Sequence, residues 1–188
     1  MSKLTQLDSA AEKKGSALVT LWQFVKFIFV SLIAMIVQFV LLNTLKFVPF
    51  IANLYAAPGD PDFHWLVFTV TAASGGLGYF IVNNTANIIA QIVSFFVNRD
   101  KTFNSDANIA ITLPIYIVFT IALICFSAWL NPVLSNLCIS KFGLGYDAAV
   151  NIATMCCSAV QFFLYFPVDK LLFPKKKENK DKEISEEE

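Results

Sequence analysis

The stretch "ANIIAQIVSFFVNRDKTF", residues 86–103, combines an apolar helix, amides inside that helix, and three consecutive charged residues after it. Its apolar part is typical of a segment that crosses a membrane, for which about 20 residues are needed. Amides within such a segment need hydrogen-bonding partners, because hydrocarbon offers none. We therefore expect the polar side of this helix to face other helices or water, and its charged end to lie at a membrane surface.

The composition of the whole chain indicates an integral membrane protein. Of its 188 residues, 56% are hydrophobic and 15% are charged, whereas soluble domains carry about 25% charged residues. The net charge is zero and no basic domain is present, which argues against a nucleic-acid-binding function. The four cysteines form no CxxC pair, so neither a disulfide framework nor a zinc site is indicated.

Working outward from the opening stretch, we predict an all-α protein with four transmembrane helices in two in-out-in hairpins. The segment 65–71 is too short to cross, and we expect it at the outer interface or against the bundle. The predicted spans are 24–45, 77–98, 109–130 and 148–168. They belong to a membrane domain, residues 22–173, between a cytoplasmic N-terminal segment, 1–21, and a disordered charged tail, 174–188.

The distribution of lysine and arginine predicts the orientation. Cytoplasmic loops are enriched in these residues. With four spans, every Lys and Arg except Lys46 and Lys141 falls on the side that carries both termini. We expect a multi-pass protein of the cell membrane with both termini in the cytoplasm.

Polar residues recur along one side of the second span. Asn83, Asn87, Gln91, Ser94 and Asn98 fall within an arc of roughly 80° on a helical wheel. They form what we call the polar stripe. Two interpretations stay open. The stripe either joins helices by hydrogen bonds, which is common in membrane bundles, or lines a path for a polar group. On the other spans, the side chains that could complete such a path are Gln38, Asn43, Asn151 and Gln161.

The charged end of the second span also has two interpretations. Arg99 and Lys101 either anchor the helix and set its topology, or bind a phosphate at the depth of the lipid headgroups. Asp100, between them, either reduces their repulsion or forms an ion pair with one of them. A short internal similarity, 96–103 to 166–173, places two phenylalanines seven residues apart in both segments.

No arrangement of catalytic residues is recognisable, so we predict a protein that is not an enzyme and has no metal or cofactor. The single histidine, His64, has no identifiable nucleophile as a partner. Proton-coupled export of a small molecule would need a carboxylate within a span. None lies inside the four predicted spans, since Asp169 comes directly after the last.

The motif "SFFVNRDKTF", residues 94–103, resembles the end of the second span in the GtrA-like family, where a run of the form S-F-x-x-N-R-x-x-x-F closes the helix. "VKFIFVS", 25–31, is similar to the opening of that family, with Ser31 where glycine is usual. Asn98, Arg99 and Phe103 match the motif directly. Asp100 departs from it, because the family often has a basic residue there.

The resemblance implies a four-span protein that translocates a polyprenyl-phosphate-linked sugar for glycosylation of a surface polysaccharide or teichoic acid. Under it, Arg99 and Lys101 hold the lipid phosphate, and Lys170 lies at the less similar end of the fourth span. Asn83, Asn87 and Gln91 hydrogen-bond the sugar. The motif residues Asn98 and Phe103 complete the expected substrate site. No ATP-binding motif GxxxxGK[ST] occurs.

A second hypothesis is a non-catalytic membrane anchor or assembly subunit that binds a membrane glycosyltransferase. It assigns the amides to contacts between helices of the two proteins. Expected partners are thus the sugar lipid, membrane lipids and glycosyltransferases. Four helices are few to enclose a polar headgroup, so a homodimer is plausible as well.

Overall fold

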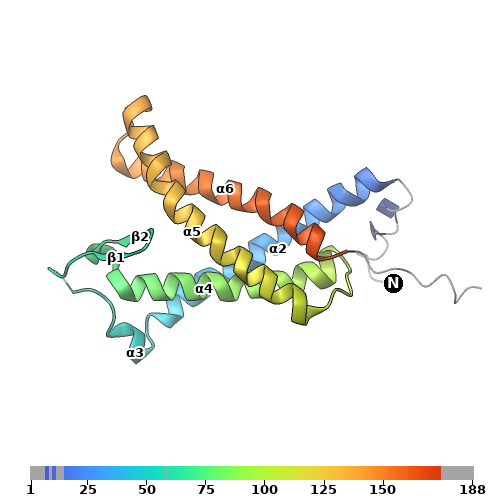
Figure 1. Ribbon diagram of the computed structural model, residues 1–188, viewed down its shortest axis with the longest axis horizontal. Coiled ribbons are helices and arrows are strands. Elements are labelled where there is room, and N and C mark those ends of the chain that lie inside the picture. The colour runs from blue at the N-terminus through green and yellow to red at the C-terminus, as the bar shows by residue number, and fades with distance from the viewer. Residues whose placement is uncertain (1–6, 9, 12–14, 58, 175–188) are drawn as a thin grey trace, which may run out of the picture.

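The structure of the chain, a computed structural model, describes residues 7–8, 10–11, 15–57 and 59–174. Four long helices dominate it: α2 (Ser16–Leu45), α4 (Gly76–Val97), α5 (Ile109–Phe142) and α6 (Tyr146–Leu172) (Figure 1). Among the described residues, these four helices are long and apolar enough to cross a membrane. The predicted all-α fold with four transmembrane helices is therefore confirmed.

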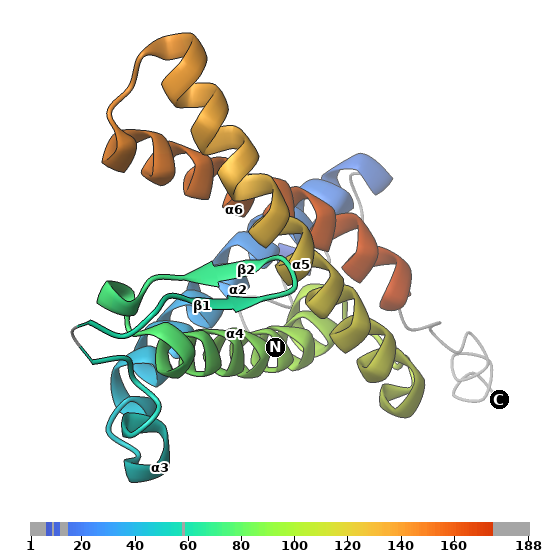
Figure 2. The ribbon, with the colours of Figure 1, turned by 60° about the vertical axis from the view of Figure 1, so that its left-hand side comes forward.

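The helices pack as two hairpins, because α2 contacts mainly α4, and α5 contacts mainly α6. We call the end of the bundle where α2 begins and α6 ends the terminal end, and the opposite end the loop end. The hairpins lie closer together at the terminal end and diverge toward the loop end (Figures 1 and 2). This divergence leaves room between them at the loop end.

The start of α2 and the end of α5 differ from the sequence prediction. Helix α2 begins at Ser16, inside the segment assigned to the N-terminal region. Helix α5 passes through Pro132 to Phe142 instead of ending at residue 130. A proline removes one backbone hydrogen bond, and side chains of neighbouring helices make this tolerable in membranes. Here Asn131 donates to Thr154 of α6 at 2.9 Å and so holds the two helices together at this point.

Helix α6 also exceeds its predicted span, 148–168, at both ends. It begins at Tyr146 and continues through Asp169 to Leu172. The charged residue was expected to mark the end of the span at a membrane surface, and it lies inside the helix instead. Of the tail predicted to be disordered, 174–188, only Pro174 falls within the described residues.

The connection between α2 and α4 holds a short helix, α3 (Pro49–Ala52), two strands and a 3₁₀ turn, η1 (Ala72–Ser74). Strands β1 (Phe63–Trp65) and β2 (Phe68–Val70) are antiparallel, with Trp65 opposite Phe68. Their rings surround Phe80 of α4, with centroid distances of 5.0 Å for Phe63 and 5.1 Å for Phe68. The segment 65–71 therefore does not cross the bundle, and its alternating pattern forms a hairpin against the start of α4.

An aromatic cluster forms the core near the terminal end. It receives side chains from all four long helices and from the segments that follow α4 and α6. Phe95 meets Tyr116 and Phe173 edge to face, at 5.2 Å and 5.0 Å between centroids, a geometry that stabilises aromatic pairs beyond their burial. The members of the aromatic cluster are Phe27, Phe95, Phe103, Tyr116, Tyr165 and Phe173.

The start of α4 depends on a close approach of two backbones. The amide of Gly78 donates to the carbonyl of Leu54 at 2.9 Å, and the amide of Ala56 donates to the carbonyl of Gly75 at 3.1 Å. A Cβ atom at residue 78 would lie 2.7 Å from the backbone nitrogen of Tyr55. Only glycine fits there, so this contact fixes the connection, and the β hairpin with it, against α4.

We predict that Gly78→Ala destabilises the protein by about 1–3 kcal/mol, because the added methyl group collides with backbone that cannot move aside easily. Thermal unfolding in detergent measures the effect. Gly145→Ala is the matched control, since a Cβ at that position meets nothing within 4 Å. Equal melting temperatures for the two variants would contradict the close approach.

Candidate functional site

The polar stripe of α4 lines two cavities inside the bundle. Asn83 and Asn87 border the first, a cavity of about 240 Å³ between β2, α4, α5 and α6. Gln91 and Ser94 border the second, of about 250 Å³ between α2, α4, α5 and α6. Gln161 of α6 lines both, so the cavities adjoin at that side chain. We call them together the groove. The stripe faces the other helices and the groove, as its periodicity predicted.

Other helices contribute further polar groups to the groove. Gln38 of α2 and Ser158 of α6 line the second cavity. The hydroxyl of Tyr116 on α5 donates to Gln91 at 3.0 Å, and Gln161 donates to Ser127 of α5. Of the four residues expected to complete the path, Gln38 and Gln161 therefore do line the groove.

Asn43 and Asn151 line neither cavity. The side chain of Asn43 is exposed and donates to the carbonyl of Phe39 in its own helix at 2.8 Å. Asn151 is exposed on α6. Both lie on helix faces that point away from the groove.

The free amides of the stripe lie in its loop-end half. Within the described part of the chain, neither Asn83 nor Asn87 has a side-chain hydrogen bond to another protein group, although both border the first cavity. Amides have two donors and two acceptor sites and are costly to leave unsatisfied in an apolar environment. These two side chains can therefore hydrogen-bond a polar group that occupies the cavity.

The terminal end of the groove is closed by a buried pair of side chains. Asn98, the last member of the stripe, donates from Nδ2 to Oδ2 of Asp169 on α6 at 2.7 Å and to Ser94 at 3.3 Å. Its Oδ1 accepts from Thr102 at 2.9 Å. Asn98 and Asp169 are both 0% exposed. The stripe therefore ends in a hydrogen-bonded link between α4 and α6, which we call the plug, and not in an open path.

Sequence reasoning missed Asp169, because a charged residue after an apolar run was taken as the end of a span. One signal pointed to it. The internal similarity of 96–103 to 166–173 includes both Asn98 and Asp169, and the structure brings these two segments into contact. Phe103, expected near the substrate, belongs to the aromatic cluster and is 1% exposed. Its position in the motif thus serves packing beside the plug.

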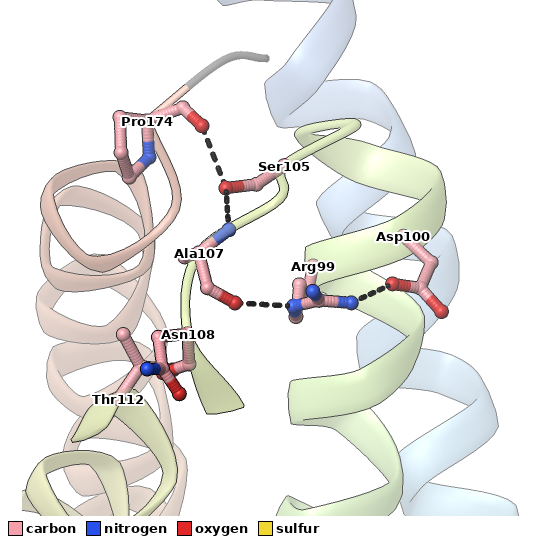
Figure 3. A network of polar contacts seen from close by, with 7 residues as sticks. All are labelled: Arg99, Asp100, Ser105, Ala107, Asn108, Thr112 and Pro174. Carbon is pink, nitrogen blue, oxygen red and sulfur yellow. Dashed lines mark hydrogen bonds and ion pairs between the residues drawn. The ribbon is translucent and has the colours of Figure 1, made fainter. Parts of the chain in front are cut away.

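Arg99 turns away from the groove. It lies one residue, or about 100°, beyond Asn98 on the helix, within a π-helical turn, η2 (Asn98–Thr102). Its Nε donates to the carbonyl of Ala107 at 3.0 Å and its Nη1 to Asp100 at 2.7 Å (Figure 3). Of the two roles considered for Asp100, the structure therefore has the ion pair.

The loop between α4 and α5 is also hydrogen-bonded to the chain that follows α6. Ser105 donates to the carbonyl of Pro174 at 2.6 Å and accepts from the amide of Ala107 at 3.2 Å (Figure 3). Arg99 thus contacts the loop between α4 and α5, and through it the chain that follows α6. In this conformation the guanidinium stabilises the terminal end of the bundle.

Three lysines surround the terminal end. Lys26 donates to the carbonyl of Lys101 at 2.9 Å and pairs with Asp8 at 2.9 Å. Lys170 donates to Thr20 of α2 at 2.8 Å. The side chains of Lys101 and Lys170 are exposed. The cations expected at this end are thus near one another, on the far side of the plug from the groove.

In the described part of the chain, no group of three or more His, Cys, Asp and Glu side chains has an arrangement suited to a metal ion. Comparison with known proteins finds no family model, no curated protein and no solved structure that matches this chain. The resemblance of residues 94–103 to the GtrA-like family therefore stays a prediction from the sequence.

We predict that Asn98→Leu lowers the free energy of unfolding by about 1–3 kcal/mol, because it leaves the buried carboxyl of Asp169 without its donor. The double variant, Asn98→Leu with Asp169→Leu, should lose less than the sum of the two single variants, since it leaves neither partner orphaned. The free energy of unfolding in detergent is measured for the unaltered protein, the two single variants and the double variant, which completes the double-mutant cycle. Simple additivity would show that the two side chains do not interact.

Proposed function

We propose that this protein moves a polyprenyl-phosphate-linked sugar between the two leaflets of the cell membrane, where the sugar serves glycosylation of a surface polysaccharide or teichoic acid. The observation that carries the proposal is the pair of free amides, Asn83 and Asn87, that border a cavity between membrane helices. A groove that has several amides within a mostly apolar lining suits a ligand with a polar head and an apolar tail.

The groove supports a sugar as the head of that ligand. Its amides offer both donors and acceptors, which match the hydroxyl groups of a carbohydrate. The two cavities, of about 240 Å³ and about 250 Å³, together fall within the roughly 300–1,000 Å³ of small-molecule sites. In the proposal Asn83, Asn87 and Gln91 bind the sugar, while the prenyl chain stays in the lipid around the helices.

The cations of the terminal end suit the phosphate. The proposal takes this end as cytoplasmic, because the lysine and arginine distribution favours that orientation. Lys101 and Lys170 have exposed side chains there. A lipid-linked phosphate lies at the same depth and attracts them. Arg99 binds the phosphate together with these lysines when its hydrogen bond to the carbonyl of Ala107 breaks. Asn98 and Phe103 then act by closing the terminal end of the groove.

The identity of the lipid rests on the sequence alone, through the resemblance of residues 94–103 to the GtrA-like family. The alternative, a non-catalytic anchor for a glycosyltransferase, assigns the amides to helix contacts. That role agrees with Gln91, which bonds Tyr116 of α5. It assigns Asn83 and Asn87 to a helix of the partner, but both border a cavity between this protein's own helices, and for this reason we favour translocation.

We predict that Asn87→Leu slows leaflet exchange of a labelled polyprenyl-phosphate sugar in proteoliposomes by about twofold to tenfold, the effect of one lost hydrogen bond. Asn43→Leu is the matched control, because it makes the same change on a face outside the groove. Exchange that is no faster with the unaltered protein than in empty liposomes would refute translocation by this protein alone.

A second prediction concerns the phosphate. Lys101→Gln should raise the concentration of sugar lipid needed for half-maximal exchange, with little change in the maximal rate, because it removes an exposed charge that attracts the phosphate. Lys141→Gln, which removes an exposed lysine at the loop end, should leave both quantities unchanged. Identical behaviour of the two variants would remove Lys101 from the site.

A further inference from the structure

Asp169 is a carboxyl group inside a membrane-spanning helix, and among the described residues it forms no ion pair. The residue is 0% exposed. Its Oδ2 accepts from Asn98, and its Oδ1 has no hydrogen-bonding partner among the described residues. An unpaired carboxylate in such a position is far costlier than the neutral acid.

Three positive groups described at the terminal end have other partners. Lys170, the next residue, bonds Thr20, and Arg99, next to Asn98, bonds Ala107 and Asp100. Lys26 of α2 bonds Asp8 and the carbonyl of Lys101.

The other groups that face Asp169 do not balance a negative charge either. Tyr116 of α5 and Tyr165 of α6 are the titratable groups near it, and their hydroxyls bond Gln91 and Thr120. Helix α4 contributes the uncharged Asn98, and the aromatic cluster supplies the remaining surroundings. Among the described residues, the carboxyl therefore has no counter-charge in the closed conformation.

The carboxyl also lies where two helices are able to bend. The π-helical turn η2 begins at Asn98 and is closed by a bond from the amide of Phe103 to the carbonyl of Asn98 at 2.9 Å. Such turns are weak points of a helix and are frequent at functional sites. On α6, Pro167 removes a backbone hydrogen bond two residues before Asp169. The plug thus joins the two helices beside an irregularity in each, the π-helical turn after α4 and Pro167 in α6.

We propose that Asp169 is a proton-binding site that keeps the groove closed at its terminal end while protonated and opens it when the proton leaves. On release the Oδ1–H bond breaks, the proton passes to water at the terminal end, and the carboxylate that remains requires hydration. The plug then separates to admit water. The transport role of this site rests on the proposed function, whereas the binding of the proton does not.

Infrared spectroscopy tests the protonation itself. In protein labelled with ¹³C-aspartate, the carbonyl stretch of a protonated carboxylic acid should be present at neutral pH, disappear at alkaline pH and be absent from Asp169→Asn. Asp100→Asn, which alters an exposed carboxylate, should retain the band. Absence of the band in the unaltered protein at neutral pH would overturn the proposal, and this measurement needs no variant to fold.

Thiol labelling tests the opening. The four native cysteines are first replaced by alanine. Ser94, which is 4% exposed and bonded to Asn98, is then replaced by cysteine. A membrane-impermeant maleimide is applied to oriented vesicles on the side that carries the terminal end. Relative to the same protein with Asp169→Asn, which corrects for thiol ionisation, labelling should rise at least about tenfold from mildly acidic to mildly alkaline pH. The same pH profile in both proteins would overturn the gate.

Neither test uses a sugar lipid, so the proton site and the proposed translocation can be refuted independently of each other. A protein that shows the infrared band and pH-dependent labelling but exchanges no sugar lipid retains the proton site and loses the proposed function. A protein that exchanges sugar lipid equally well with Asp169→Asn at every pH retains the function and loses the gate.

Discussion

The hydrogen bond from Asn98 to Asp169, 2.7 Å long and fully buried, determines the arrangement of the bundle at its terminal end. It is the polar link between α4 of one hairpin and α6 of the other, in a region where water is absent and each polar group needs a protein partner. The aromatic cluster packs around it, and the π-helical turn begins at Asn98. The opposite half of the groove is bordered by the amides of Asn83 and Asn87.

The polar stripe of α4 serves two purposes along its length. Near the terminal end, Gln91 and Asn98 bond Tyr116 and Asp169 and so hold the helices together. Toward the loop end, Asn83 and Asn87 border a cavity without such bonds. The two interpretations that the sequence left open thus apply to different halves of the same helix. Divergence of the hairpins agrees with this division, because the described side-chain bonds between the long helices of the two hairpins lie in the terminal half of the bundle.

Periodicity predicted the spans and the direction of the stripe well, since both depend on which residues tolerate hydrocarbon. Helix ends were predicted poorly where they depend on tertiary partners. Asp169 and Pro132 both resemble stop signals in a single sequence, yet α6 continues with one carboxyl oxygen of Asp169 bonded to Asn98, and α5 continues with Asn131 bonded to α6. Such partners lie far away in the chain and leave no local pattern. The outward turn of Arg99 likewise follows from its contact with Ala107, eight residues on.

The central claim is that the groove holds the polar head of a lipid, and photocross-linking tests it most directly. A polyprenyl-phosphate sugar with a diazirine on the sugar ring is bound to the protein in liposomes and irradiated, and the modified residues are located by mass spectrometry. The account predicts attachment within residues 83–91 of α4 and around Gln161 of α6. Attachment confined to the lipid-facing side of α2, at exposed residues such as Phe29 and Phe39, would contradict it.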